Sequence, residues 1–445
     1  MLQHPYPPVI RQSGLALCLV GFCLALGLVF SLPFTHESSS LLYKFGVDRI
    51  LLLSAKLCGI LSACLLLIQF LLASRLKILD RFFGLDRLLN LHRCFALLLL
   101  LAAALHPLLI VLSEGGWFIP FRLDYWPEFL GMLLLISLLA TSGTAVFFRS
   151  LGLRFDQWWL GHRIAAPLLI LFMGLHVLNV SETFAAGFPR NLLFVGLGAA
   201  ALLWVWIRLR PLKNRKSRHE VVLVKSLAQD TTVVELRPCS DQALSYMPGQ
   251  FVFVSFTSGQ VSSEEHPFTL ASAPGGDPEL QLLVRASGDW TQKLHLLCPG
   301  DTVSLDGPFG LFSYLSYPRA EEYLFIAGGV GITPFLSMLR QMRLDRQRIR
   351  VTLLWFNQTR ERRILDSELH QLTRELPLFQ IQDIFTREKG GGKPDFQELS
   401  RRLSSCSRQA RCFICGPPKM MHDMHKTLVS LGFPRHRIHQ ERFAL

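Results

Sequence analysis

The chain has 445 residues, half of them hydrophobic, and a formal net charge of +13 at neutral pH. Long apolar runs dominate up to about residue 210, and the remainder has the composition of an ordinary soluble protein, which excludes a single soluble domain. The charge does not require nucleic acid as a partner, because much of it flanks the apolar runs, where it orients helices in a membrane.

Six apolar segments approach the roughly 20 residues that a membrane-spanning helix needs. They are residues 14–32, 50–72, 91–112, 129–148, 158–180 and 191–207. The first could instead be a signal peptide, but its apolar run is long, only Arg11 precedes it as a basic residue, and no clear cleavage site follows. We therefore expect a first spanning helix.

Basic residues predict the orientation of these helices. They concentrate in the loops that are cytoplasmic if both termini are cytoplasmic, most densely between Arg208 and Arg218, whereas the opposite loops hold only Lys44, Arg49, Arg122 and Arg190. This bias predicts an integral membrane protein with six spans, expected in a bacterial inner membrane. None of the ten cysteines falls in a predicted outer loop, so no disulfide framework is expected.

Four of the fourteen histidines lie in predicted spans, His92 and His106 in the third and His162 and His176 in the fifth. Each pair is 14 residues apart, which is nearly four helical turns and about 21 Å along one face. The two helices run in the same direction, because one span separates them. His92 can therefore face His162, and His106 can face His176, so that each couple could hold one haem iron.

Each histidine could instead be a buried polar residue bonded within the bundle, although ionisable residues in membranes are costly and usually functional. Two pairs with the same spacing on co-directional helices favour two b-type haems. Arg93 and Arg163 follow the predicted inner ligands. They could neutralise haem propionates or simply anchor the helices at the positive side.

The soluble half contains two patterns. After a basic linker, the segments EVVLVKSLA, TTVVELRP and QFVFVSF alternate in polarity and predict a small antiparallel barrel. From about residue 320, strands alternate with helices, which predicts a parallel α/β sheet with its ligand at the carboxyl ends of the strands. The turn GGVGITP (328–334) joins a strand to a helix and suits a pyrophosphate. Alone, such a turn could be merely a tight turn.

In order and spacing, HPFTLAS, GDWT, DGPFG, GGVGITP and CGPP resemble the ferredoxin–NADP reductase superfamily. The HPFT motif resembles the form found in the membrane branch of this superfamily, the NADPH oxidases and ferric reductases. The six-span haem domain of that branch matches the histidine pattern. The resemblance implies a haem domain over 1–210, an FAD-binding barrel over 211–316 and an NAD(P)H-binding α/β domain over 317–445.

The resemblance also implies site residues. Those that would hold FAD are His266, Pro267, Phe268, Thr269, Ser272, Arg285, Gly288, Trp290 and Thr291. Those that would take the NAD(P)H pyrophosphate are Gly329, Gly331, Thr333 and Pro334, and those that would bring the nicotinamide to the flavin are Cys415, Gly416 and Pro417. Cys415 could instead be a small buried hydrophobic residue.

Two further positions concern specificity and the C-terminus. Thr386 and Arg387, with help from Arg360, occupy the place where NADPH-using relatives bind the 2′-phosphate, so NADPH is expected and NADH is possible; a solvated basic loop is the alternative. Many relatives end on an aromatic residue that stacks on the flavin, whereas this chain ends Phe443-Ala444-Leu445. Phe443 is expected to stack only if the tail bends back.

The resulting hypothesis is electron transfer from cytosolic NADPH through FAD and two haems to an acceptor on the outer face. The acceptor is expected to be dioxygen, giving superoxide, with a ferric or cupric complex or a membrane or periplasmic partner protein as alternatives. An alternative from a different functional class is a membrane transporter that merely senses nucleotide. The expected partners are membrane lipid, NAD(P)H and the acceptor, and the sequence indicates no regulatory subunit.

Overall fold

The computed structural model describes residues 8–441 except 117–121, 149, 214–217, 229, 241–242, 389–391 and 393. It contains two compact units. One is helical and comprises Ser13–Leu76 and Arg87–Lys213, and the other comprises Lys77–Asp86 and the chain beyond Lys213. All nine cysteines whose surroundings are described are free thiols.

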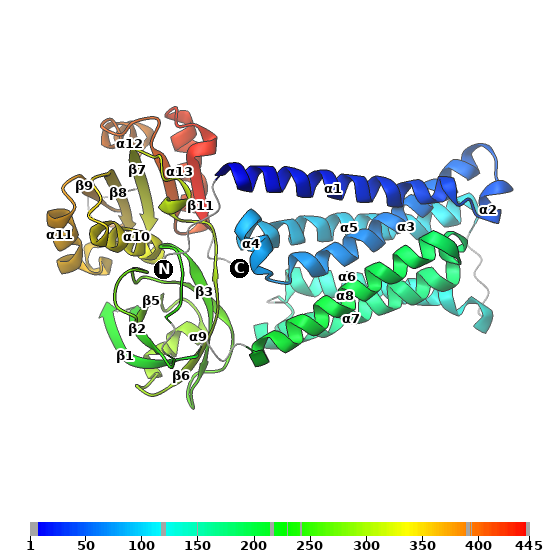
Figure 1. Cartoon of the computed structure of the whole chain (residues 1–445), viewed down its shortest axis with the longest axis horizontal. Coiled ribbons are helices and arrows are strands. Elements are labelled where there is room, and N and C mark those ends of the chain that lie inside the picture. Colours follow the sequence, from blue (N-terminus) through cyan, green and yellow to red (C-terminus); the bar gives the residue numbers. More distant parts are fainter. Residues whose placement is uncertain are drawn as a thin grey trace. The chain divides into compact units, whose positions relative to one another are not determined.

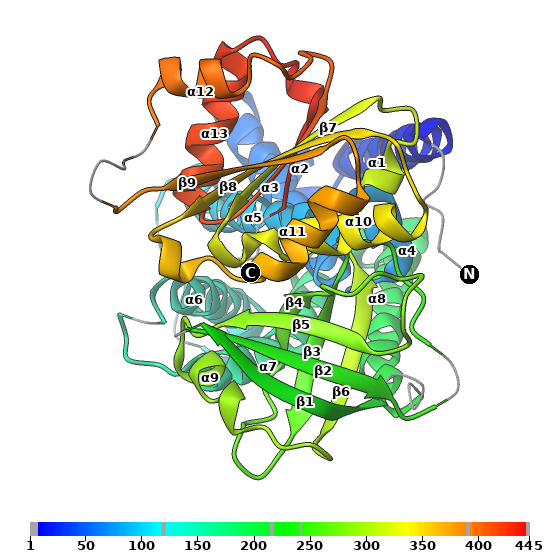
Figure 2. The same cartoon turned by 90° about the vertical axis from the view of Figure 1, so that its left-hand side faces the viewer.

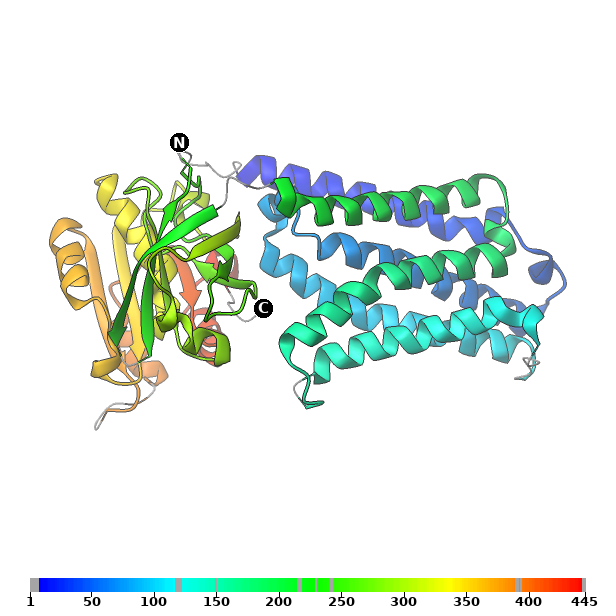
Figure 3. The ribbon, with the colours of Figure 1, turned by 90° about the horizontal axis from the view of Figure 1, so that it is seen from below.

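The helical unit consists of long helices that run side by side (Figures 1 and 3). They are α1 Pro8–Thr35, α3 Gly46–Leu72, α5 Leu85–Ser113, α6 Trp126–Phe147, α7 Phe155–Val180 and α8 Gly187–Lys213, with the short α2 Ser39–Leu42, η1 Leu123–Tyr125 and η2 Glu182–Phe184 between them. Among the described residues, five helices are long and apolar enough to cross a membrane, and Leu19–Thr35 of α1 forms a shorter apolar helix.

These helices are apolar on more than one face. Residues such as Leu97, Leu133 and Leu202 are exposed, as expected where lipid rather than water surrounds a bundle. The buried side is a smaller cluster drawn from α3, α5, α6, α7 and α8: Leu65, Leu66, Leu99, Leu138, Leu169, Ile170, Met173 and Ala200. This composition confirms a helical membrane domain.

The second unit begins with a six-stranded antiparallel sheet in the order β4-β3-β6-β1-β2-β5. Its strands are β1 Arg218–Ala228, β2 Thr231–Pro238, β3 Phe251–Thr257, β4 His266–Thr269, β5 Leu280–Arg285 and β6 Thr302–Phe309, with α9 Asp289–Gln292 and η4 Leu294–Leu296 between β5 and β6. An isolated bridge, Leu270↔Leu282, links its two edges. The antiparallel architecture is confirmed, although the hydrogen-bonded ladder does not close into a complete barrel.

A five-stranded parallel sheet follows in the order β11-β10-β7-β8-β9. Its strands are β7 Glu322–Gly328, β8 Arg350–Asn357, β9 Phe379–Phe385, β10 Arg411–Cys415 and β11 Ile438–Glu441. Helices α10 Thr333–Leu344 and α11 Asp366–Glu375 cover one face, and α12 Phe396–Arg402 and α13 Pro418–Ser430 cover the other (Figure 2). The connecting 3-10 turns are η5 Tyr314–Ser316, η6 Gly329–Ile332, η7 Arg360–Arg362 and η8 Arg435–Arg437. The predicted α/β domain is confirmed.

Helix α4 (Lys77–Phe83) belongs to this second unit although it lies between two membrane helices in sequence. The Asp80 carboxylate accepts hydrogen bonds from Gly310 N at 3.1 and 3.2 Å and from Leu85 N at 2.8 Å. Lys77 Nζ donates to Gly307 O at 2.7 Å. The predicted membrane domain over 1–210 includes this segment, because no local sequence pattern marks its contact with the end of β6.

Candidate functional site

The four membrane histidines form two facing couples. His92 on α5 lies opposite His162 on α7 with 6.3 Å between ring centres, and His106 lies opposite His176 with 6.4 Å. The ring planes are inclined by 69° and 83°. The structure therefore brings together the two couples that the 14-residue spacing predicts.

These separations fit an iron ion between the rings. A metal–imidazole bond is about 2.0–2.1 Å long, and the ring centre lies about 1.2 Å beyond the nitrogen. Two imidazoles on opposite sides of one iron therefore have ring centres about 6.4 Å apart by the same bond lengths. A direct hydrogen bond between two imidazoles would instead bring two nitrogens to about 3 Å.

Three of the histidines are oriented by main-chain carbonyls of neighbouring helices. The Nδ1 atoms of His106 and His176 lie 2.8 Å from Ala55 O and Pro127 O, and that of His92 lies 3.3 Å from Gln69 O. Because a carbonyl can only accept, Nδ1 carries the proton and Nε2 keeps its lone pair. This arrangement is the one that a metal-ligating imidazole needs.

Two glycines make room for the His106–His176 couple. A Cβ added at Gly59 on α3 would lie 2.9 Å from His106 Nδ1, and one added at Gly131 on α6 would lie 2.6 Å from His176 Cε1. Both positions are helical, so the glycines serve close approach rather than unusual backbone geometry. Sequence reasoning missed them, because an isolated glycine in an apolar helix carries no signal of what it faces.

In the antiparallel sheet, the residues predicted to hold the flavin form an aromatic platform. The Trp290 ring lies 4.2 Å from the His266 ring and is stacked at 5.9 Å on Phe268. Trp290 Nε1 donates to Ser262 O at 2.9 Å, which fixes the indole. Pro267 pairs with Phe253 in the β3–β4 ladder, so the HPFT segment is an edge strand.

The polar side chains predicted to hold the flavin fall into two kinds: some are available to a ligand, and others are hydrogen-bonded within the protein. Thr269 is buried, and its hydroxyl has no partner among the described residues, so it is available to a ligand. Ser272 Oγ instead contacts the Tyr246 hydroxyl at 2.8 Å. Thr291 Oγ1 accepts from Gly288 N at 2.9 Å, which caps α9. The hydrogen bonds of Ser272, Gly288 and Thr291 within the protein therefore fix the local backbone and side chains around the site.

Arg285 connects the two sheets. Its Nε donates to the Asp230 carboxylate at 2.9 Å, and a Cβ added at Gly329 would lie 3.3 Å from its guanidinium. Gly329 has φ +55 and lies at the end of β7. The cation predicted for the flavin phosphate is thus adjacent to the glycine turn predicted for the second nucleotide.

The glycine turn also abuts the Cys-Gly-Pro-Pro segment. A Cβ at Gly331 would lie 2.5 Å from Cys415 O, and one at Gly416, which has φ +159, would lie 3.0 Å from Gly328 Cα. Pro417 Cδ lies 2.7 Å from the position of a Cβ on Gly328. Thr333 Oγ1 donates to Val330 O at 2.7 Å, and Pro334 follows in the first turn of α10. Only glycine permits the two turns to approach this closely.

The predicted 2′-phosphate residues also converge. Thr386 N donates to Asn357 O and Arg387 N to Gln358 O, both at 2.9 Å, at the carboxyl ends of β8 and β9. The Arg360 guanidinium lies 5.4 Å from the centre of the Phe385 ring. Sequence reasoning missed Glu388, whose carboxylate accepts from Arg360 N at 2.7 Å. An acidic group therefore stands beside the three predicted residues.

Buried acids lie on the other side of Cys415. Cys415 pairs with Glu441 in the β10–β11 ladder, and both are buried. Burial raises the pKa of the Cys415 thiol, and the nearby Glu441 raises it further. Burial also raises the pKa of Glu441, with a further contribution from Asp86 and Asp80. Cys415 is therefore a neutral thiol, suited to packing rather than nucleophilic attack. Phe443 lies outside the described residues.

Three domain families match the chain. They are described as ferric reductase like transmembrane component over residues 58–173, FAD-binding domain over 217–312 and oxidoreductase NAD-binding domain over 325–426. In turn they fall on the central part of the helical unit, on the antiparallel sheet and on the parallel sheet.

Individual relatives agree with these matches. The chain is 26% identical to Dual oxidase 2 of Sus scrofa over 85% of its own length but only 29% of that protein. It is 33% identical to Ferric reduction oxidase 3, mitochondrial, of Arabidopsis thaliana over 30% of this chain and 19% of that one. A flavohemoglobin structure from Malassezia yamatoensis shares the fold, with a TM-score of 0.50 at 16% identity and coverage of 89% and 98%.

Proposed function

Because the chain belongs to the NADPH oxidase and ferric reductase family, we propose that it moves electrons across a membrane. The donor is NADPH, the carriers are FAD and two b-type haems, and the acceptor lies on the opposite face. The two histidine couples carry this proposal, since their ring separations of 6.3 and 6.4 Å suit one iron each.

When bound, FAD takes up two electrons as a hydride and releases them singly, and haem iron carries one electron at a time. The chain positions these groups. Thr269 and the Trp290 platform would hold the flavin, Arg285 and Gly329 would receive the two phosphate groups, and Gly331 with Cys415 would let the nicotinamide approach. His92 and His162 form the inner ligand couple, and His106 and His176 form the outer one.

The direction of transfer rests on the charge of the loops. The strongly basic run after Arg208 marks the cytoplasmic side by the positive-inside tendency, so the nucleotide domains face the cytoplasm. The His106–His176 couple then lies toward the outer side. This charge bias supports the proposal that both termini are cytoplasmic, and a bacterial inner membrane is our proposal for the location.

Dioxygen is the acceptor that the loop chemistry favours. Acidic residues at the predicted outer side would attract metal cations if they were free. Several are instead paired: Glu37 with Arg49 at 3.1 Å, Glu114 with Lys44 at 3.0 Å and Asp124 with Arg122 at 3.1 Å. Glu182 accepts from Ser39 N and Oγ at 2.7 and 2.8 Å. This pairing favours a neutral acceptor over a ferric or cupric complex.

The test combines haem analysis with turnover. Purified protein loaded with haem should hold two b-type haems per chain and show a dithionite-reducible spectrum; absence of that spectrum would overturn the proposal. NADPH-driven reduction of a superoxide reporter in air should be abolished by superoxide dismutase. Ferric chelate reduction that persists without oxygen would instead make the protein a metalloreductase.

A further inference from the structure

His162 departs from the pattern of the other three histidines. Its Nδ1 is buried, and no described residue accepts a hydrogen bond from it. The other three Nδ1 atoms each reach a main-chain carbonyl at 2.8 to 3.3 Å. A buried N–H without an acceptor is destabilising, so this position requires a partner.

The register of two helices locates the missing partner. His176 on α7 reaches Pro127 O on α6, and α6 and α7 are consecutive antiparallel helices in contact. Moving 14 residues back along α7 gives His162, and moving 14 residues forward along α6 gives Thr141. Among the described residues, however, His162 Nδ1 makes no hydrogen bond to the Thr141 carbonyl, whose oxygen has the Thr144 hydroxyl 3.1 Å away. The pattern in which the Nδ1 atom of each of these histidines reaches a main-chain carbonyl is therefore interrupted at His162.

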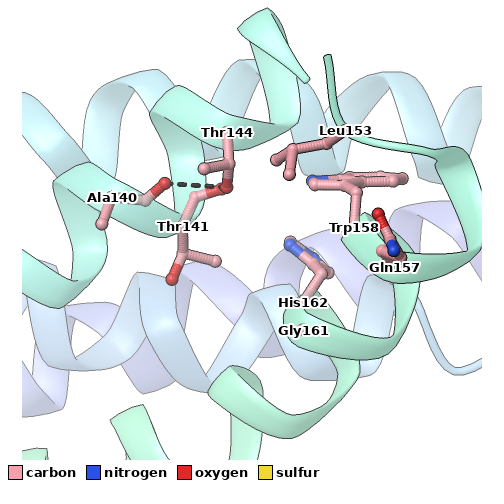
Figure 4. A pocket seen from close by; sticks show the side chains of 8 residues that line it. All are labelled: Ala140, Thr141, Thr144, Leu153, Gln157, Trp158, Gly161 and His162. Carbon is pink, nitrogen blue, oxygen red and sulfur yellow. Dashed lines mark hydrogen bonds between the residues drawn. The ribbon is translucent and has the colours of Figure 1, made fainter. Parts of the chain in front are cut away.

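A cavity occupies the position where this contact would be. The cavity is open to its surroundings rather than enclosed, its volume is ≈ 250 Å³, and its lining includes Thr141, Thr144, Trp158 and His162 (Figure 4). Roughly 15 Å³ is enough for one water molecule, so several would fit. Trp158 Nε1 is also buried without a partner among the described residues. Two N–H donors that lack an acceptor therefore border the same cavity.

The threonines of α6 supply the complementary groups. Thr141 Oγ1 donates to Ser137 O at 2.7 Å, and Thr144 Oγ1 donates to Ala140 O at 2.8 Å (Figure 4). Each hydroxyl proton is therefore used, and the oxygen lone pairs remain to accept. A ligand that accepts from the two nitrogens and donates to the hydroxyls satisfies every group. Water does both.

We propose that this cavity is a water site that replaces the helix carbonyl as the hydrogen-bond partner of His162. The inference rests on the proposed haem ligation. If Nε2 of His162 faces the iron, Nδ1 points to the opposite side of the ring, away from the porphyrin plane. The acceptor is therefore not the porphyrin edge. Outer-shell partners of a ligating histidine set its orientation and basicity, so the inner couple differs from the outer one in how it is held.

The test uses two variants of the haem-loaded protein. Ala140→Leu fills the cavity from α6, and Trp158→Phe removes one N–H while keeping an aromatic ring. Trp204→Phe on α8 is the matched control, since Trp204 does not line the cavity. Haem content and low-temperature EPR are measured, because each low-spin ferric bis-imidazole haem gives its own low-field signal.

We expect both variants to keep two haems and to shift one of the two EPR signals, with the larger shift in Ala140→Leu, while Trp204→Phe shifts neither. Two unshifted signals in both variants would overturn the water site. Loss of one haem in Ala140→Leu would also overturn it, because the porphyrin edge would then occupy the cavity. Fewer than two haems in the unmodified protein would instead contradict the proposed function, so the two failures are distinguishable.

Discussion

Gly131 offers the sharpest test of the outer histidine couple. In Gly131→Ala, the new Cβ would lie 2.6 Å from His176 Cε1 and 2.9 Å from Nδ1. Ordinary contact begins at 3.4 Å, so the ring must move by about 0.8 Å, which overpacks the surrounding side chains. This movement would also disturb the 2.8 Å contact of Nδ1 with Pro127 O.

The magnitude follows from the cost of overpacking. An extra carbon in a packed interior costs about 1–3 kcal/mol. If this free energy destabilises the haem-bound state, the affinity of the outer couple for haem falls about 5- to 150-fold, because 1.4 kcal/mol corresponds to a factor of ten. The inner couple has no contact with Gly131 and should keep its haem.

The assay is titration of the apoprotein with haem, followed by the pyridine haemochrome content. Gly143→Ala is the control, because it lies on the same helix and its Cβ would meet nothing within 4 Å. Both substitutions gain helix propensity, by up to about 1 kcal/mol, so only Gly131→Ala should lose one haem. Two haems bound with unchanged affinity in Gly131→Ala would refute the assigned geometry.

The remaining predictions address the other elements of the site. His106→Leu should leave one haem reducible by NADPH and stop transfer to the acceptor, as stopped-flow spectra would show; unimpaired transfer to the acceptor would contradict the route through the outer couple. Burial raises the pKa of Asp80 to about 6 despite the hydrogen bond from Gly310 N. Folding therefore takes up a proton, and the free energy of unfolding falls by about 3 kcal/mol as pH rises from about 4 to 6. Asp80→Asn should remove this dependence in melting curves, and an unchanged pH profile would contradict it. Arg387→Ala should raise KM for NADPH about 10- to 150-fold, the worth of a charged hydrogen bond, and leave NADH unchanged. Glu388→Gln should weaken NADH instead, and equal effects on both nucleotides in steady-state kinetics would count against this assignment.

Much of this protein could be predicted from local sequence. Apolar runs of about 20 residues predict membrane helices because the bilayer core fixes the length. The 14-residue spacing of His92 and His106 places both on one face, because helix geometry is local. The glycine turn at Gly329 and the β-alternation before His266 identify the nucleotide domains for the same reason. Each of these features depends on residues close together in the chain.

Only the tertiary structure determined which residues that are distant in sequence contact one another. Gly59 and Gly131 matter because they lie against His106 and His176, which are distant in sequence. Asp80 belongs to the second unit only because the chain folds back to Gly310, and Glu388 stands beside Arg360 only because β8 and β9 end together. The unpartnered Nδ1 of His162 depends on the packing of α6 against α7. Such contacts are set by side-chain fit between helices and strands, which local periodicity does not encode.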